Sequence, residues 1–212
     1  EGNKIAMVEV TCETDFVANN ADFGATADKA AEITLAAGND EITAEHKAII
    51  DTIAIKFREN MAVRRSAFVE VGANAVAGTY VHSDKKTGAI VVVEGSTSDE
   101  VKAFAKDCCL HLAAFTPTYI TKDEVPQSYI DEQKEIFAAQ MNADEKMASK
   151  PQNVKDGILN GKINKLLAES CFVDQPFVKD DKVTVAKKLE EVGKAAGAKL
   201  SFGKIVLFVL GK

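Results

Sequence analysis

The stretch MVEVTCETDFVANNADF, residues 7–23, decides how the rest of the chain is interpreted. Its first residues, Met7–Val10, combine apolar, polar and β-branched side chains in the way of a β-strand. The residues that follow favour turns and helix caps: Thr14, Asp15, Asn19 and Asn20. The sequence therefore predicts a strand that runs out into an exposed turn.

Phe16 stands beside the charged Asp15 in this turn. A large aromatic side chain at a polar tip leaves apolar surface in water unless it folds back or meets a partner. Two interpretations stay open, because spacing alone does not separate them. Phe16 packs beneath the following helix as a core residue, or it is exposed for contact with another molecule.

The composition is that of a soluble globular chain. With 212 residues, of which 46% are hydrophobic and 27% charged, the chain is long enough for a core in one large or two small domains. The net charge of −6 argues against a protein that binds nucleic acid through its phosphates, which requires clustered lysine and arginine. A protein partner or a small ligand is expected instead.

No apolar run approaches the roughly 18 residues of a membrane span, and the N-terminus has no signal-peptide pattern. We therefore expect no membrane contact and a cytosolic location. The chain begins without methionine and runs almost at once into a strand, so we also expect that residues precede Glu1 and that this is a fragment.

Residue types used in catalysis are present without a motif that joins them. Cysteines at positions 12, 108, 109 and 171 lack the CxxC spacing and the paired histidines of a zinc site. The segment 157–162 contains a Gly-Lys pair, but its loop is too short for a phosphate-binding P-loop. We therefore expect no catalytic residue, no metal site, no cofactor and no covalent catalysis.

Helices and strands follow one another in a clear order, because capping residues and a change of hydrophobic period separate them. The predicted strands cover residues 4–11, 67–71, 77–82, 88–94 and 199–210, and the predicted helices cover residues 22–37, 44–60, 99–115, 128–147, 151–168 and 183–196. Short connections between the three middle strands predict one antiparallel meander.

Two of these helices behave differently from the rest. Only three residues separate the helices at 128–147 and 151–168, and so short a link predicts an αα-hairpin. Their apolar positions are sparse, enough to hold two helices together but not to cover a second face. We expect a protruding arm whose apolar residues serve mainly the arm itself.

The helix at 99–115 carries an apolar stripe with His111 at its edge. A histidine at such a border packs, caps or contacts a partner, and the sequence favours packing.

The stretch VEVTCETDFVA, residues 8–18, resembles the signature of the elongation factor Ts family, in which a TDFV motif is the hallmark. Further stretches look like family landmarks in the right order: Val63-Arg64-Arg65, Gly78 to His82, His111 to Ala114, Ser149-Lys150-Pro151, Gly161-Lys162 and Gln175 to Val178. They span essentially the whole chain. Lys162 stands where the family often has arginine, and the family's N-terminal helical module is expected ahead of Glu1.

The resemblance implies an α+β fold with two related subdomains of antiparallel sheet and packed helices. The first subdomain is expected at residues 1–96 and the second at residues 97–212. An antiparallel helical hairpin, or coiled-coil arm, is expected to be inserted in the second subdomain at residues 127–168.

The resemblance also implies a function. Members of the family bind elongation factor Tu in its GDP-bound and nucleotide-free states, displace Mg²⁺ and promote release of GDP for exchange with GTP, without being enzymes in the covalent sense. The residues implied to act near the partner's Mg²⁺ are Thr14, Asp15, Phe16 and Val17. The helix that carries His111 and Leu112 is implied to contact a partner helix.

Several alternatives stay open. A protein-binding scaffold could work through the hairpin, with Phe16 merely structural, and an enzyme could use Cys12 or His111. Self-association through the hairpin is undecided. The compartment is the cytoplasm, or the matrix if the source is an organelle.

Overall fold

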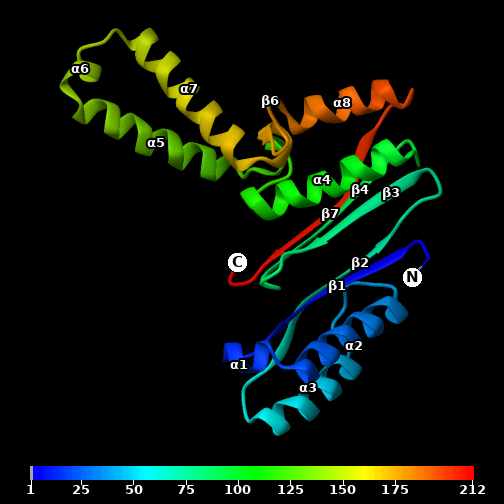
Figure 1. Cartoon of the computed structure of the whole chain (residues 1–212). Coiled ribbons are helices and arrows are strands. Elements are labelled where there is room, and N and C mark those ends of the chain that lie inside the picture. Colours follow the sequence, from blue (N-terminus) through cyan, green and yellow to red (C-terminus); the bar gives the residue numbers. More distant parts are fainter. Residues whose placement is uncertain (1) are drawn as a thin grey trace.

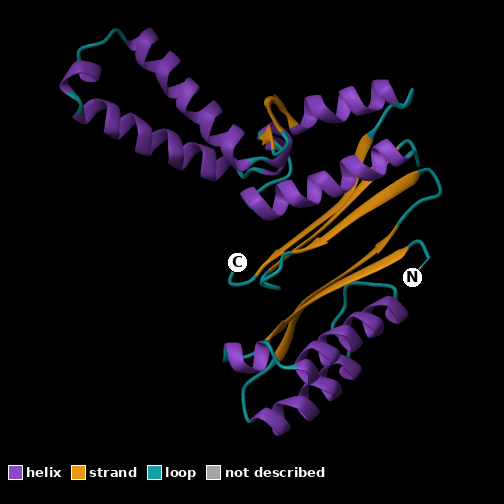
Figure 2. Cartoon of the chain, in the orientation of Figure 1, coloured by secondary structure: helices purple, strands orange, loops and turns teal. Residues whose placement is uncertain are grey.

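Two antiparallel sheets lie face to face, and helices cover the outer side of each (Figure 1, Figure 2). This computed structural model describes residues 2–212. In one sheet β1 (Lys4–Thr11) pairs with β2 (Ala62–Glu70), and in the other the order is β3 (Ala75–Val81), β4 (Thr87–Glu94), β7 (Ser201–Val209). A small hairpin of β5 (Pro176–Phe177) and β6 (Asp180–Thr184) lies apart from both. The predicted α+β class is confirmed.

The predicted three-stranded meander is wrong. β2 pairs with β1, so that Lys4 lies opposite Glu70, while β3 pairs with β4. Residues 71–74 carry the chain from one sheet to the other instead of closing a hairpin within one sheet. The reason is burial, because Ala67 and Val69 of β2 pack against the face of β4 and not beside β3 as a neighbouring strand.

β4 is the centre of the fold, since both of its faces are buried. Ile90 and Val92 face the β1–β2 sheet, whereas the alternate residues Ala89, Val91 and Val93 belong to the core on the opposite side. A strand covered on both sides has a continuous apolar sequence, as the run AIVVV shows.

Helices cover the outer faces of both sheets (Figure 1). The β1–β2 sheet is covered by α2 (Ala21–Ala37) and α3 (Ala44–Phe57), and the β3–β4–β7 sheet by α4 (Asp99–Phe115). A fourth helix, α8 (Val185–Ala195), packs beside α4. α4 approaches β3 so closely that a Cβ at Gly78 would lie 2.4 Å from the carbonyl of Ala105. Within residues 2–212 no helix is long and apolar enough to cross a membrane.

The segment expected as a hairpin contains α5 (Gln127–Ala143), α6 (Glu145–Ala148) and α7 (Gln152–Ser170), with short 3₁₀ turns η1 (Lys122–Glu124) and η2 (Phe172–Asp174) on either side. The helix predicted at 128–147 is broken at Asp144. That residue has extended φ and ψ of −89° and 113°, and its carboxylate accepts the N–H groups of Lys146 and Met147.

α5 and α7 contact each other and project away from the sheets (Figure 1). At their base, α7 contributes the buried Ile163 and Leu167 to a cluster that also includes Val125 and Cys171, which lie outside the two helices. The expectation that the apolar residues of the arm serve mainly the arm therefore holds only for its outer part. The base is continuous with the body of the protein.

The predicted division into residues 1–96 and 97–212 remains a prediction of domain organisation. The sheets do not divide there, because β3 and β4 precede residue 97 and yet share a sheet with β7. The chain passes from the β1–β2 sheet to the β3–β4–β7 sheet at residues 71–74.

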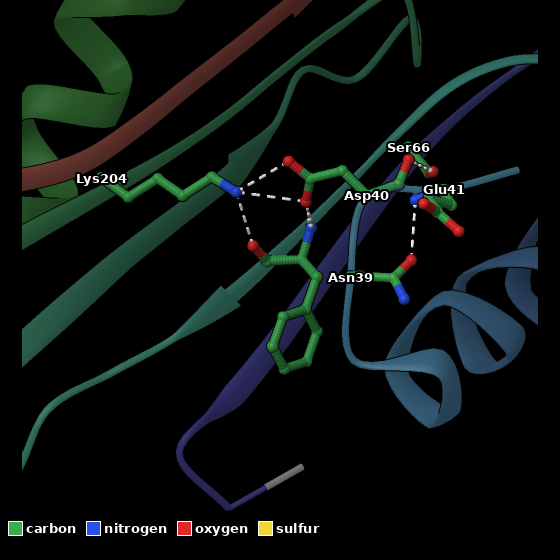
Figure 3. Close-up of polar contacts among 6 residues, drawn as sticks. Asn39, Asp40, Glu41, Ser66 and Lys204 are labelled. Carbon is green, nitrogen blue, oxygen red and sulfur yellow. Dashed lines mark hydrogen bonds and ion pairs between the residues drawn. The ribbon is translucent and has the colours of Figure 1, made fainter.

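An ion pair that we call the Asp40–Lys204 clasp joins the two sheets at the edge of β2 (Figure 3). Asp40, in the loop between α2 and α3, accepts the N–H of Phe68 at 2.6 Å. Lys204 of β7 donates to both carboxylate oxygens of Asp40, at 3.1 and 2.9 Å, and to the carbonyl oxygen of Phe68 at 2.8 Å. Charged side chains thus occupy the position that another strand would take.

Arg65 makes a second link between the sheets. Its Nε donates to the carboxylate of the buried Glu9 at 2.6 Å, and its Nη2 donates to the carbonyl oxygen of Val209 at 3.0 Å. The guanidinium also lies 4.4 Å from the centre of the Phe208 ring. The β1–β2 sheet is thereby fixed to the end of β7.

Candidate functional site

The TDFV motif forms a single helical turn, α1 (Asp15–Ala18), directly after β1. Thr14 caps it, since its hydroxyl oxygen accepts the N–H of Val17 at 3.4 Å. Val17 is buried, with 6% of its surface exposed, whereas Phe16 is 92% exposed. The interpretation of Phe16 as a core residue is therefore wrong, and the neighbouring Val17 is the anchor of the turn.

Glu59, in the loop between α3 and β2, holds the start of this turn. One carboxylate oxygen accepts the N–H groups of Glu13 and Thr14 at 3.0 and 3.1 Å, and the other accepts the hydroxyl of Thr14 at 2.5 Å. The hydrogen bond from the Thr14 hydroxyl is the main reason why the pKa of Glu59 lies below its usual value. Glu59 was not predicted as a site residue, because nothing local relates it to residues 45 positions earlier.

The turn between β3 and β4 lies beside α1. Nζ of Lys86 is 3.5 Å from a carboxylate oxygen of Asp15. The same turn begins after Val81, which is 63% exposed, and His82, which is also exposed. Phe16 and Val81 are thus exposed apolar side chains at one end of the molecule, on segments joined by an ion pair.

A groove separates these two segments. The apolar side chains that line it include Met7 and Val10 of β1, Phe23 of α2, Phe208 of β7 and Leu210, which directly follows β7. Val81 and His82 were not predicted as contact residues. The sequence feature that could have pointed to them is the outward position of Val81 at the end of a predicted strand.

His111 and Leu112 do not lie on the surface. Both side chains are completely buried, which agrees with the packing that the sequence favours for His111. A contact between the α4 helix and a helix of a partner remains a prediction. The segment that follows α7 covers His111 and Leu112. The sequence of α4 alone does not show that another segment covers these two residues. The exposed side chain nearby is Phe115, half exposed, with its ring centre 4.7 Å from that of His111.

The contacts of His111 define its protonation. Its Nδ1 accepts the N–H of Val178 at 3.2 Å, so the proton resides on Nε2, which donates to the side-chain oxygen of Gln175 at 2.8 Å. Burial lowers the pKa of His111, although the hydrogen bond to Gln175 opposes this. A neutral His111 ties α4 to the segment that leads into β5.

The thiols are not activated for nucleophilic chemistry. Burial raises the pKa of Cys12, Cys108, Cys109 and Cys171, that of Cys109 to about 12. Among residues 2–212 no group of three or more histidine, cysteine, aspartate or glutamate side chains could hold a metal ion. The end of the molecule with α1 instead presents an exposed aromatic ring, a carboxylate and an adjacent strand turn.

Comparison with known proteins identifies the family of the chain. The family model described as Elongation factor TS matches residues 13–212. Proteins named Elongation factor Ts from Treponema denticola, Treponema pallidum and Deinococcus radiodurans are 47%, 44% and 38% identical to the chain. The matches cover 98%, 98% and 100% of this chain and 75%, 73% and 76% of those relatives. The chain therefore belongs to the elongation factor Ts family and is a factor of translation elongation.

Proposed function

We propose that this chain binds elongation factor Tu and accelerates the release of GDP from it, so that GTP takes the vacated site. Membership of the family supports the partner and the role in elongation. Such a factor works where its partner works, in the cytoplasm or in the matrix of an organelle. It makes and breaks no covalent bond and requires no cofactor of its own.

The exposure of Phe16 is the observation that carries this proposal. Its backbone is fixed by the buried Val17 on one side and by Thr14 on the other, yet 92% of its own surface remains in water. Burial of such a side chain in a partner's pocket is worth about 1.5–3 kcal/mol. That is small beside the binding of a nucleotide but sufficient to displace one structural element of the partner.

The element to be displaced is the support of Mg²⁺ in the nucleotide site of the partner. Mg²⁺ demands near-octahedral oxygen geometry at about 2.0–2.1 Å, so a shift well below 1 Å weakens its hold on the phosphates. Asp15 and Phe16 would act there together. By linkage, a factor that loosens GDP is itself loosened by GDP, and it therefore binds the nucleotide-free partner more tightly than the GDP-bound one.

The turn between β3 and β4 provides a second contact in this proposal. Val81 and His82 are exposed, and Lys86 of the same turn pairs with Asp15. His111 then acts indirectly, because it packs against Phe115 and binds the segment that leads into β5, while Leu112 belongs to the buried core. A substitution at either residue alters the surface beside it without removing a direct contact.

The test measures release of fluorescently labelled GDP from elongation factor Tu as the concentration of this chain rises. The release rate is expected to increase and then saturate. If the chain binds the partner, as shown by titration, but leaves the release rate unchanged, the exchange proposal is wrong.

A scaffold that works through the arm is the second candidate. α5 and α7 expose Ile136 and Val154, each about two-fifths exposed, which would serve a partner or a second copy of the chain. Binding that is lost when the outer arm is removed, with no effect on GDP release, would favour the scaffold. Sedimentation of the chain alone shows whether the arm mediates self-association.

A further inference from the structure

α1 has too little internal support to hold its own shape. It contains four residues, and a helix of that length is not stable by itself, because nucleation fixes several residues for a single hydrogen bond. All four residues of α1 lie in the described part of the chain, and of them only Val17 is buried. The exposed Phe16 contributes no packing within the chain. The position of Phe16 must therefore be set by residues outside the turn.

Glu59 supplies that support from a distant part of the sequence. Its two carboxylate oxygens accept three hydrogens at the entrance to α1, from the N–H of Glu13 and from the N–H and hydroxyl of Thr14. The next residue, Asn60, donates a hydrogen bond to the side chain of Glu13. Two consecutive residues of the α3–β2 loop thus hold Glu13 and Thr14, at the entrance to the TDFV turn.

The backbone before Glu59 is shaped for this contact. Arg58 ends α3 in the left-handed region, with φ of 57° and ψ of 36°, a conformation that costs energy for a residue other than glycine. The reversal of the chain at Arg58 places Glu59 beside Thr14. Because Thr14 donates its hydroxyl hydrogen to Glu59, its oxygen lone pairs remain directed toward the N–H of Val17.

We propose that Glu59 is a positioning residue for nucleotide exchange, which holds the TDFV turn in the form that presents Phe16 to the partner. This inference rests on the proposed function. Glu59 acts through the turn and not by touching the reacting groups. Without it, the chain entering α1 samples other conformations, and only a fraction of the molecules present Phe16 correctly.

Such a role predicts a specific kinetic signature. When only a fraction of the factor is competent, the apparent affinity falls by that fraction, whereas the saturated complex still reaches the productive geometry. Glu59→Ala is therefore expected to raise the half-saturating concentration of the factor about five- to tenfold and to change the maximum rate of GDP release less than twofold. Phe16→Ala, in contrast, is expected to lower the maximum rate itself.

Two further variants sharpen the experiment. Glu59→Gln keeps an oxygen that can accept the two N–H groups but loses the charge, so its half-saturating concentration should fall between those of wild type and Glu59→Ala. Glu190→Ala removes the same charge from an exposed position on α8 and is expected to behave as wild type. Amide hydrogen exchange of Thr14 should accelerate in Glu59→Ala and not in Glu190→Ala.

A double-mutant cycle with Phe16 provides the decisive outcome. If Glu59 works through Phe16, adding Glu59→Ala to Phe16→Ala should produce no further loss of exchange. Losses that multiply in the double variant would overturn the inference while leaving the proposed function intact. If Phe16→Ala alone leaves exchange unchanged, the proposed site is wrong and this inference falls with it. If Glu59→Ala fails to fold, the same cycle with Glu59→Gln distinguishes these outcomes.

Discussion

Lys204 and Asp40 form an ion pair across the two sheets, with Nζ of the lysine 2.9 and 3.1 Å from the two carboxylate oxygens. Asp40 also accepts the N–H of Phe68, and Lys204 also donates to its carbonyl oxygen. At the edge of β2 the pair therefore makes the hydrogen bonds that a neighbouring strand would make. Partial burial alone would raise the pKa of Asp40, but the N–H of Phe68 and the charge of Lys204 hold it below the usual value. The clasp therefore couples the sheet that precedes α1 to the sheet that carries the β3–β4 turn.

Removal of the clasp should lower stability by a moderate amount. Lys204→Met keeps the aliphatic stem and loses the charge-assisted hydrogen bonds, and we expect a loss of about 1 kcal/mol in the free energy of unfolding. That corresponds to a fall of roughly 2–4 °C in Tm for a chain of this size. The control Lys187→Met, at an exposed position on α8, should leave Tm unchanged. Equal Tm values in thermal unfolding for the two variants would show that the clasp contributes nothing.

Phe16→Ala should separate function from folding. Because the side chain is almost wholly exposed, its loss should leave Tm within about 1 °C of wild type, while a lost anchor at an interface slows GDP release at least tenfold. Ile42→Ala removes another exposed apolar side chain, in the loop between α2 and α3, and should affect neither quantity. Parallel losses of stability and exchange in Phe16→Ala would instead indicate a packing role.

Most helices could be predicted from the sequence because their boundaries are local. Asn20, Ser98 and Thr184 accept a backbone N–H at the start of their helices, and Gly38 ends α2 with a positive φ of 69°. Asp144 is the instructive exception. It lies within a favourable helical pattern, yet its side chain caps the following turn and separates α5 from α6.

Pairings between distant segments could not be predicted in the same way. The alternation of residues in β2 shows that one face is buried but not whether β1 or β3 lies beside it, and the meander was wrong for that reason. The contact of Glu59 with Thr14 joins positions with no shared pattern. His111 lies at the border of the apolar stripe of α4. Its burial depends on Gln175 and Val178, which belong to the segment after α7.

His111 should make stability depend on pH below neutrality. Its pKa is lowered in the folded state, so the unfolded chain gains a proton near the ordinary pKa of 6.5 while the folded chain does not. The contribution is therefore complete above pH 6.5 and is lost as pH falls, by up to about 1.4 kcal/mol per pH unit. Urea unfolding between pH 7.5 and 5 should give a smaller decline for His111→Gln than for wild type. Identical declines would mean that His111 titrates normally.

The arm should be removable only in part. Replacing residues 134–160 with a short flexible linker keeps Tyr129, Ile130, Ile163 and Leu167 at the base, and the product should unfold cooperatively near the wild-type Tm. Replacing residues 127–168 removes Ile163 and Leu167 and exposes Cys171, so it should cost at least about 2 kcal/mol more. Equal stability of the two products by thermal and urea unfolding would contradict a structural role for the base.

The mode of action of α1 is tested by magnesium. If Asp15 and Phe16 act by disturbing the support of Mg²⁺ in the partner, a chelator already performs part of their task. The acceleration that this chain produces, expressed as a ratio of GDP-release rates, should therefore shrink when EDTA replaces Mg²⁺. The double variant Asp15→Ala/Phe16→Ala should lose the magnesium-sensitive part and keep whatever the β3–β4 turn contributes.

Four rates of GDP release decide the matter: wild type and the double variant, each with excess Mg²⁺ and with chelator. Two perturbations of one site should combine to less than the product of their separate effects, whereas independent perturbations should multiply. Because Lys86 pairs with Asp15, the control Lys86→Ala shows how much of the loss comes from freeing the neighbouring turn and not from the missing carboxylate. An acceleration of equal size with and without Mg²⁺ would exclude displacement of the metal, and the contacts of Val81 and His82 would then have to carry the exchange.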